Sequence, residues 1–291
     1  MDAISVVVRR GGVVESRHGV DAVAVQDGAV VAEAGEATRV AFLRSAAKPF
    51  QALPLVRARA DLTAAEIAIA SASHLARPEQ LEPVRSLLAK AGAGEDDLEC
   101  GPEPTRLEHN CSGKHAGMLA LCRARGWASA GYRLPDHPVQ RACAAEIAAG
   151  ADVAEADVPT AVDGCGVVTF ALPLERMALL FARLEQLDGG TAVAAAMRAH
   201  PELIRGPGAP DTELMRTCPG WTAKGGAEGV LCAAGPDGIG LALKVADGGG
   251  RAVGPALAEL LRRLGVDAPA LAVVELANSR GEPVGEVVAD R

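Results

Sequence analysis

Both ends of the chain carry the alternation of apolar and polar residues that is typical of β-strands, whereas the middle carries helical patterns. The first 35 residues contain the runs ISVVVRR, VVESRHG, VDAVAVQDG and AVVAEAG. The Asp27-Gly28 pair predicts a hairpin turn between the last two runs. Residues 221–248 have strand, turn, strand, turn, strand character, and a short strand is expected to close the chain.

Apolar residues recur at helical spacing between these two regions. A helix is predicted over RSAAKPFQALPLVRARA, with Pro49 in its first turn, and Thr63 with Glu66 forms the pattern of a capping box. Further helices are expected over residues 63–70, 78–91, 114–126, 138–149, 174–187 and 251–265. The order of elements therefore predicts a single α+β domain over residues 1–291, in which a largely antiparallel sheet formed from both chain ends has flanking helices.

The composition argues against several classes of protein. Hydrophobic residues make up 49% of the 291 residues but aromatic residues only 2%, so the core must consist mainly of Ala, Val and Leu. Few aromatic residues and a net charge of −8 argue against a surface that binds nucleic acid. No apolar run reaches transmembrane length, and the N-terminus predicts a strand and not a signal peptide. We therefore expect a cytoplasmic enzyme with a small-molecule substrate and no membrane partner.

The cysteine and lysine contents single out a few side chains. Seven cysteines are expected to stay reduced in a cytosolic chain, most of them as small buried side chains. Lysine, unlike arginine, can lose its proton near neutral pH when its pKa is lowered, so a rare lysine is a candidate for chemistry. Of the 29 basic residues, the lysines are Lys48, Lys90, Lys114, Lys224 and Lys244.

Ser45-Ala46-Ala47-Lys48 is the first pattern that could carry chemistry. If a helix begins near Ser45, positions i and i+3 share one face, and the Ser45 hydroxyl and Lys48 amine come within hydrogen-bond reach. A lysine with a lowered pKa can activate the serine as a nucleophile, and the helix N-terminus would offer N–H groups to an oxyanion. The alternative is structural, with a serine N-cap followed by a lysine whose ammonium reaches water.

Two polar loops could complete such a site. The run HNCSGKH over residues 109–115 precedes a strong helix and contains two imidazoles, a thiol and an amine. In the second loop, Asp163-Gly164-Cys165-Gly166, the carboxylate suits a substrate α-amino group and the glycines allow close approach. Two cysteines on loops with a nearby lysine or histidine could hold zinc, or they could be two unrelated buried thiols.

Two further segments have both a functional and a structural interpretation. Ser71-Ala72-Ser73-His74 ends a helix, so it is either a C-cap or a place where a hydroxyl and an imidazole reach a cleft. Lys224-Gly225-Gly226 lies at a strand end, where the glycines leave room for a ligand beside the strand. The alternative for this second segment is a surface β-turn.

Five motifs together carry a family resemblance. RSAAKPFQALPL, SASH, HNCSGKHAGML, DGCGVVTFALPL and AKGGAEGV, in that order, resemble the thermolabile, rhizobial-type L-asparaginase II family. The motifs span residues 44–230, and the resemblance extends over nearly the whole chain. It implies a fold similar to serine β-lactamases and glutaminases, cleavage of L-asparagine to L-aspartate and ammonia, zinc as cofactor, and a homodimer. One departure follows Ser73-His74, where the family has a Gly-Glu step and this chain has Leu75-Ala76.

The resemblance also implies roles for individual residues. Ser45 is implied as the nucleophile with Lys48 as its base, and Ser73 with Lys224 as a second serine–lysine pair. The implied zinc ligands are Cys111, Lys114 and Cys165, and a lysine bound to zinc must be neutral. The implied substrate-binding residues are His74, Asn110, Asp163 and Gly164. The alternatives are a glutaminase or another serine acyl hydrolase on the same fold, or a non-catalytic protein that binds zinc or an amino acid.

Overall fold

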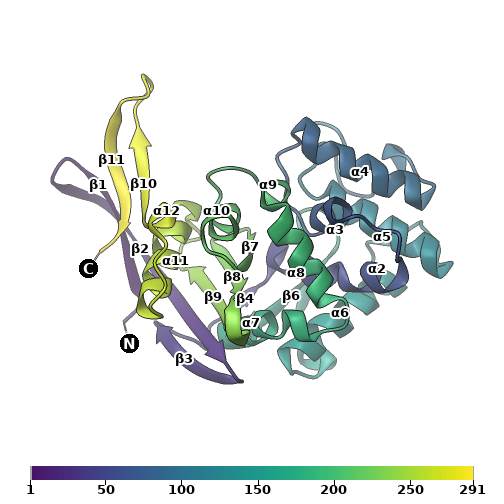
Figure 1. Cartoon of the computed structure of the whole chain (residues 1–291), viewed down its shortest axis with the longest axis horizontal. Coiled ribbons are helices and arrows are strands. Elements are labelled where there is room, and N and C mark those ends of the chain that lie inside the picture. Colours follow the sequence, from purple (N-terminus) through teal and green to yellow (C-terminus); the bar gives the residue numbers. More distant parts are fainter. Residues whose placement is uncertain (1, 291) are drawn as a thin grey trace. The chain divides into compact units, whose positions relative to one another are not determined.

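The computed structural model describes residues 2–290 and places the strands of both chain ends in one sheet (Figure 1). Contacts between residues divide the chain into two units. The sheet unit contains the residues up to Ala41, Leu172–Ala182 and the residues from Gly208 onward, and the helical unit contains Phe42–Ala171 and Arg183–Pro207. The predicted α+β class is confirmed, whereas the extent of one domain over residues 1–291 stays a prediction.

The sheet unit contains strands in the order β10-β11-β1-β2-β9-β8-β7, with β3 paired to β2. All of these pairs are antiparallel, as the alternation of apolar and polar residues led us to expect. The strands are β1 (Ile4–Arg10), β2 (Val13–Gln26), β3 (Ala29–Ala34), β7 (Thr222–Gly226), β8 (Val230–Ala234), β9 (Gly240–Val245), β10 (Val273–Ala277) and β11 (Pro283–Ala289).

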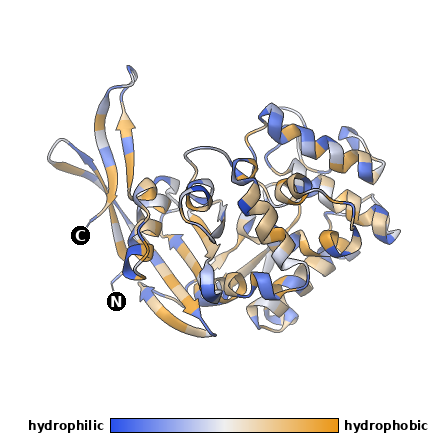
Figure 2. Ribbon diagram, viewed as in Figure 1, coloured by the Kyte–Doolittle hydropathy of each residue, from blue (hydrophilic) through white to orange (hydrophobic). Residues whose placement is uncertain are grey.

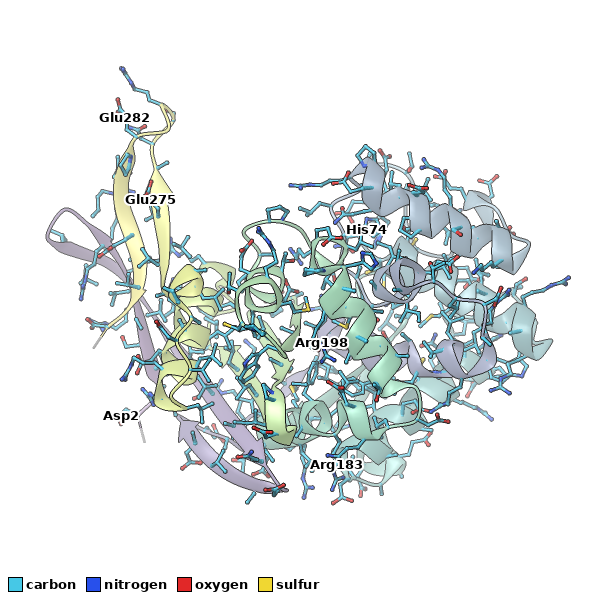
Figure 3. All side chains as sticks on the ribbon, viewed as in Figure 1. Asp2, His74, Arg183, Arg198, Glu275 and Glu282 are labelled. Carbon is cyan, nitrogen blue, oxygen red and sulfur yellow. The ribbon has the colours of Figure 1, made fainter. Side chains whose placement is uncertain are left out.

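The sheet differs from the prediction in two places. The runs VVESRHG and VDAVAVQ form the single strand β2, because Gly19 pairs with Ser5 and the ladder continues through it without a turn. The expected closing strand is a hairpin of β10 and β11, with Glu275 on β10 and Glu282 at the connecting turn (Figure 3). The turn predicted at Asp27-Gly28 is confirmed, since both residues have positive φ angles and join β2 to β3.

Helices pack against both faces of this sheet. On one face, Leu257 of α11 (Val253–Arg263) shares a core with Val20 of β2 and Leu243 of β9. Figure 2 shows hydrophobic and hydrophilic segments alternating along the strands. On the opposite face, α7 (Leu174–Ala182) lies so close to β9 that a Cβ at Gly240 would be 1.9 Å from the Ala178 carbonyl oxygen. The remaining helices of the unit are α10 (Pro210–Thr217) and α12 (Pro269–Ala272).

The helical unit follows the predicted helices closely. Its helices are α1 (Lys48–Gln51), α2 (Leu53–Ala58), α3 (Ala64–Ala70), α4 (Pro78–Ala91), α5 (Ser112–Arg125), α6 (Pro138–Ala151), α8 (Gly190–Ala199) and α9 (Pro201–Ile204). A second, small sheet of the chain has the order β4-β6-β5 and consists of β4 (Val40–Phe42), β6 (Val168–Pro173) and β5 (Thr160–Val162), of which only β5 lies entirely within the helical unit. The capping box that starts α3 is confirmed, because the Thr63 N–H donates to Glu66 and the Glu66 N–H donates to Thr63 Oγ1.

The helix predicted over RSAAKPFQALPLVRARA, which carries the first candidate motif, is broken, as is the helix predicted over residues 174–187, where α7 is followed by the 3-10 helix η4 (Leu184–Gln186). Residues 44–58 form the 3-10 helix η1 (Arg44–Ala47) followed by α1 and α2, with Ala52 between them. Pro49 lies in the first turn of α1, as expected. Pro54 has no N–H to donate to the carbonyl of Phe50, so the chain restarts as α2 with Pro54 in its first turn. Across residues 2–290, no helix combines the length and the apolar character needed to cross a bilayer.

Helices α3 and α5 are in backbone contact at Gly113, and this contact positions the start of α5. A Cβ at Gly113 would lie 2.3 Å from the carbonyl oxygen of Ile69, so any side chain there must push the helices apart. We expect Gly113→Ala to lower the free energy of unfolding by about 1–3 kcal/mol, the usual cost of overpacking. Urea unfolding measures this difference.

The matched control is Gly101→Ala, because a Cβ at Gly101 would meet no atom within 4 Å. Equal stability of the two variants would contradict a tight contact between α3 and α5.

Candidate active site

Lys48 is fully buried in the helical unit, and its amine is bonded to the segment that follows α3. The Lys48 Nζ donates to the Ala72 carbonyl oxygen at 2.5 Å and to Ser73 Oγ at 2.9 Å. Burial lowers the pKa of Lys48 below its ordinary value, because the interior disfavours the charged form. A buried amine of lowered pKa beside a hydroxyl is the arrangement that can accept a proton from a serine.

Ser45 lies in η1 with its side chain half-buried. The hydrogen bond that we predicted between Ser45 and Lys48 is not made: among residues 2–290, Lys48 Nζ donates to Ala72 and Ser73 instead. An i, i+3 contact of this kind requires an α-helix from Ser45, but the chain enters through Arg44 at a φ of 50° and forms a 3-10 turn. A positive φ at a residue other than glycine is a strained conformation that often marks a functional site.

The backbone around Ser45 leaves one N–H group free. The Arg44 N–H donates to Thr169 Oγ1 at 3.2 Å, and the Ala46 N–H donates to the Leu43 carbonyl oxygen at 2.9 Å. Between them, the Ser45 N–H has no hydrogen-bond partner within the described part of the chain. A free N–H on the nucleophile itself is one of the groups that can hold an oxyanion.

The segment Ser71–His74 combines the two roles considered from the sequence. Ser71 is the C-cap of α3, and its hydroxyl donates to the Ile67 carbonyl oxygen, whereas Ser73 faces Lys48. His74, labelled in Figure 3, has both ring nitrogens engaged, with Ser112 Oγ at 2.9 Å and the Ala76 N–H at 3.1 Å. Burial lowers the pKa of His74 to about 3, so the ring is neutral. His74 therefore ties this segment to the start of α5, and its contact with substrate stays a prediction.

The structure brings Cys111, Lys114 and Cys165 together in the helical unit. Cys111 is the N-cap of α5 and Lys114 lies in its first turn, while Cys165 lies in the turn closed by the hydrogen bond from the Gly166 N–H to the Asp163 carbonyl oxygen. The Lys114 Nζ lies 3.0 Å from Cys165 Sγ, and all three side chains are buried. The two loops that we singled out in the sequence thus form one cluster.

The pKa values of the three side chains in this cluster shift in different directions. A hydrogen bond from Cys111, followed by the positive charge of Lys114, lowers the pKa of Cys165 far below its ordinary value. The hydrogen bond to Cys165 and burial raise the pKa of Cys111. Burial disfavours the Lys114 ammonium, but the negative charges on Cys165 and Cys111 outweigh it and raise the pKa of Lys114. These pKa shifts favour the charged forms, an ammonium on Lys114 and a thiolate on Cys165.

The donor set fits zinc in its chemistry. Zinc prefers thiolate and nitrogen ligands, and two sulfurs and one amine nitrogen lie together here. Within the part of the chain that the structure describes, no three His, Cys, Asp or Glu side chains form a group that could hold a metal ion. A metal bound by Cys111, Lys114 and Cys165 would therefore depend on the lysine, and zinc stays a prediction.

Asp163 is paired with an arginine that the sequence did not indicate. Its Oδ1 accepts from Arg44 Nε at 2.6 Å and from the Gly164 N–H at 2.9 Å. The Asp163 carboxylate is mostly buried and Gly164 is exposed. The partner of Asp163, Arg44, directly precedes Ser45 in the chain. Asn110 is exposed and its Oδ1 lies 3.0 Å from Cys111 Sγ. The substrate contacts of Asp163, Gly164 and Asn110 stay predictions.

Lys224 belongs to β7 of the sheet unit and is fully buried, so the surface-turn alternative is wrong. Its Nζ lies 3.6 Å from Asp211 Oδ2 and donates to the Gly225 carbonyl oxygen at 2.6 Å. The same Asp211 oxygen accepts from the Gly225 N–H at 2.9 Å. We did not predict Asp211, because one acid in the first turn of a helix has no distinguishing sequence signal. The pairing of Lys224 with Ser73 stays a prediction.

Comparison with known proteins supplies the identity of the family. A family model described as L-asparaginase II matches residues 6–289. No curated protein matches the chain. Because the family match covers nearly all of the 291 residues and includes all five motifs, the chain belongs to the L-asparaginase II family and is an asparaginase-type hydrolase of amide C–N bonds.

Proposed function

We propose that the chain hydrolyses L-asparagine to L-aspartate and ammonia through an ester on Ser45. The observation that carries the proposal is the buried Lys48 amine, which has a lowered pKa, lies three residues after Ser45 and bonds the Ser73 hydroxyl at 2.9 Å. A lysine in this state can act as a base at neutral pH. The half-buried Ser45 hydroxyl and the free Ser45 N–H suit a nucleophile and an oxyanion donor.

The chemistry divides into two half-reactions. Neutral Lys48 takes the proton of Ser45, and the Ser45 Oγ bonds to the amide carbon of the substrate. The carbon–nitrogen bond then breaks, and the departing NH₂ group takes the proton from Lys48 and leaves as ammonia. Water attacks the ester, gives one proton to the Ser45 oxygen by way of Lys48, and releases aspartate. In this proposal Asp163 binds the substrate ammonium group, and Ser73 with Lys224 forms the second serine–lysine pair.

We expect Ser45→Ala to lower kcat for ammonia release from L-asparagine by a factor of about 10³ or more, because the nucleophile is lost. Ammonia release is measured with L-asparagine and, in parallel, with L-glutamine and a chromogenic cephalosporin. Faster turnover of either alternative substrate would favour a glutaminase or another acyl hydrolase.

Two other serines make the assay decisive. Ser71→Ala is the matched control and should retain activity, because among the described residues the Ser71 hydroxyl donates only to the Ile67 carbonyl oxygen of α3. Ser73→Ala tests the hydroxyl that Lys48 contacts. Near-normal turnover by Ser45→Ala together with an inactive Ser73→Ala would move the nucleophile to Ser73.

The state of Lys48 predicts a pH dependence. Only the neutral amine can take a proton, so kcat/KM should fall as the pH drops through the pKa of Lys48 and the amine becomes charged. Because burial lowers that pKa, the decrease in kcat/KM should occur at a pH below the ordinary pKa range of lysine. A pH–rate profile tests this, and Lys48→Met should lose the activity at every pH. A profile that is flat on the acid side would contradict Lys48 as the base.

We also propose that Cys111, Lys114 and Cys165 hold zinc. When bound, the metal would supply positive charge that orients the substrate and polarises its carbonyl group. Binding requires Lys114 to lose its proton to solvent, so we expect zinc affinity to fall as the pH is lowered.

Zinc content by elemental analysis and ammonia release are measured before and after chelation. Lys114→Met should bind zinc at least about 10-fold more weakly, since one ligand is lost. Full activity after complete removal of the metal would exclude a polarising role.

A further inference from the structure

Asp211 is a buried carboxylate that has no part in the reaction described above. It lies in the first turn of α10, beside the strand β7 that carries Lys224 (Figure 1). Both residues belong to the sheet unit. An isolated buried charge costs much more free energy than a paired one, so a buried acid next to a buried amine calls for an explanation.

The surroundings of Asp211 favour a negative charge on its side chain. Its Oδ1 accepts from the Thr212 N–H and its Oδ2 from the Gly225 N–H, both at 2.9 Å. Because a backbone N–H can only donate, both oxygens act as acceptors, as the oxygens of an ionised carboxylate do. The start of α10 also places the positive end of the helix dipole at this carboxylate.

Lys224 completes a ring of contacts with the same carboxylate. Its Nζ lies 3.6 Å from Asp211 Oδ2 and donates to the Gly225 carbonyl oxygen at 2.6 Å. Gly225 therefore donates to the acid through its N–H and accepts from the amine through its C=O. Lys224 is fully buried, and an opposite charge within about 4–6 Å favours the charged form of a buried amine.

The other ionisable side chains on the elements that pack against β7 in the sheet unit leave this pair undisturbed. These elements are β8 and α10, and the side chains are Cys232, Glu213 and Arg216. Cys232 lies opposite Lys224 in the ladder, and burial raises the pKa of its thiol, so that it is neutral at pH 7. Glu213 and Arg216 pair with each other at 3.1 Å.

The two buried lysines Lys48 and Lys224 thus differ in the groups that surround their amines. Lys48 Nζ donates to a carbonyl oxygen and a hydroxyl, which are uncharged, whereas Lys224 Nζ lies against a carboxylate. An uncharged acceptor is compatible with a neutral amine, but an ionised carboxylate favours an ammonium.

We propose that Asp211 is a positioning residue that holds Lys224 as an ammonium, so that Lys224 supplies a fixed positive charge to the reaction and Lys48 alone acts as the base. The part that Lys224 takes in turnover rests on the proposed function. Its charge state does not, because Asp211, Gly225 and Lys224 form their ring within the sheet unit.

The charge of Lys224 can be measured directly on the wild-type protein. The chain has few lysines, so protein labelled with ¹³C at the lysine ε-carbon gives few signals, and the Lys224 signal is identified by its loss in Lys224→Arg. The ε-carbon chemical shift distinguishes the ammonium from the amine. We expect the ammonium shift throughout the range from about pH 6 to about pH 9. Conversion of Lys224 to the amine within this range would overturn the proposal.

Asp211→Asn removes the negative charge and keeps the size of the side chain. We expect Lys224 in this variant to convert to the amine at a pH at least about one unit lower than in the wild type, because the buried ammonium loses its opposite charge. Glu213→Gln is the matched control, since Glu213 lies on the same helix but pairs with Arg216. An unchanged titration of Lys224 in Asp211→Asn would overturn the proposal.

Asp211→Glu keeps the experiment decisive if Asp211→Asn fails to fold. It retains the carboxylate, so we expect Lys224 to stay an ammonium over the same pH range as in the wild type. A folded Asp211→Glu in which Lys224 is an amine at pH 7 would contradict the proposed role of the carboxylate.

Turnover gives a second readout. If Lys224 acts as an ammonium, kcat/KM for L-asparagine should fall at high pH as Lys224 loses its proton. This alkaline limb should move to lower pH by about one unit or more in Asp211→Asn and stay in place in Glu213→Gln, whereas a mere packing defect would lower the activity without moving the limb. An unmoved limb in an active Asp211→Asn would overturn the proposal. Absence of ammonia release by the wild type would refute the proposed function alone, because the spectra still decide the charge of Lys224.

Discussion

The buried amine of Lys48 is the constraint on which the rest of the helical unit depends. A lysine removed from water must lose its charge or find acceptors, and an uncompensated buried charge costs several kcal/mol. Here the Ala72 carbonyl oxygen and Ser73 Oγ supply the acceptors. The end of α3 must therefore lie against α1, and this contact brings the SASH and RSAAK motifs together although 24 residues separate Lys48 from Ala72. The same burial that constrains the fold lowers the pKa of the amine and makes it a possible base.

The cluster of Cys111, Lys114 and Cys165 also contains a buried lysine amine, but with a different neighbour. Lys114 is buried as well, but the Cys165 sulfur, 3.0 Å away, raises its pKa and favours the charged form. One buried lysine thus favours the neutral form and the other the charged form, and the difference comes from the neighbouring thiol. Environments that push the pKa values of similar groups apart are a property of sites that handle protons. Next to Lys114 in the chain, His115 Nδ1 bonds the Tyr132 hydroxyl, which also accepts from the Glu99 N–H.

Most elements could be predicted from the sequence because their signals are local. The capping box at Thr63, the turn at Asp27-Gly28 and the end of α5 at Gly126 each depend on residues a few positions apart. The prediction was wrong where a distant partner decides. Gly19 continues β2 because Ser5 pairs with it, and Lys48 turns from Ser45 to Ser73 because the chain enters η1 through the strained Arg44.

Consecutive residues were enough to indicate the α+β class, most strands and helices in their order along the chain, and the five motifs that identify the family, because periodicity, caps and motifs are local patterns. The tertiary structure alone decided which side chains meet. Asp163 pairs with Arg44, Lys224 with Asp211, and His115 with Tyr132, and none of these partners has a sequence signal. The physical reason is that a buried polar group takes whichever complementary group the packing of helices and strands brings within reach, at any separation along the chain.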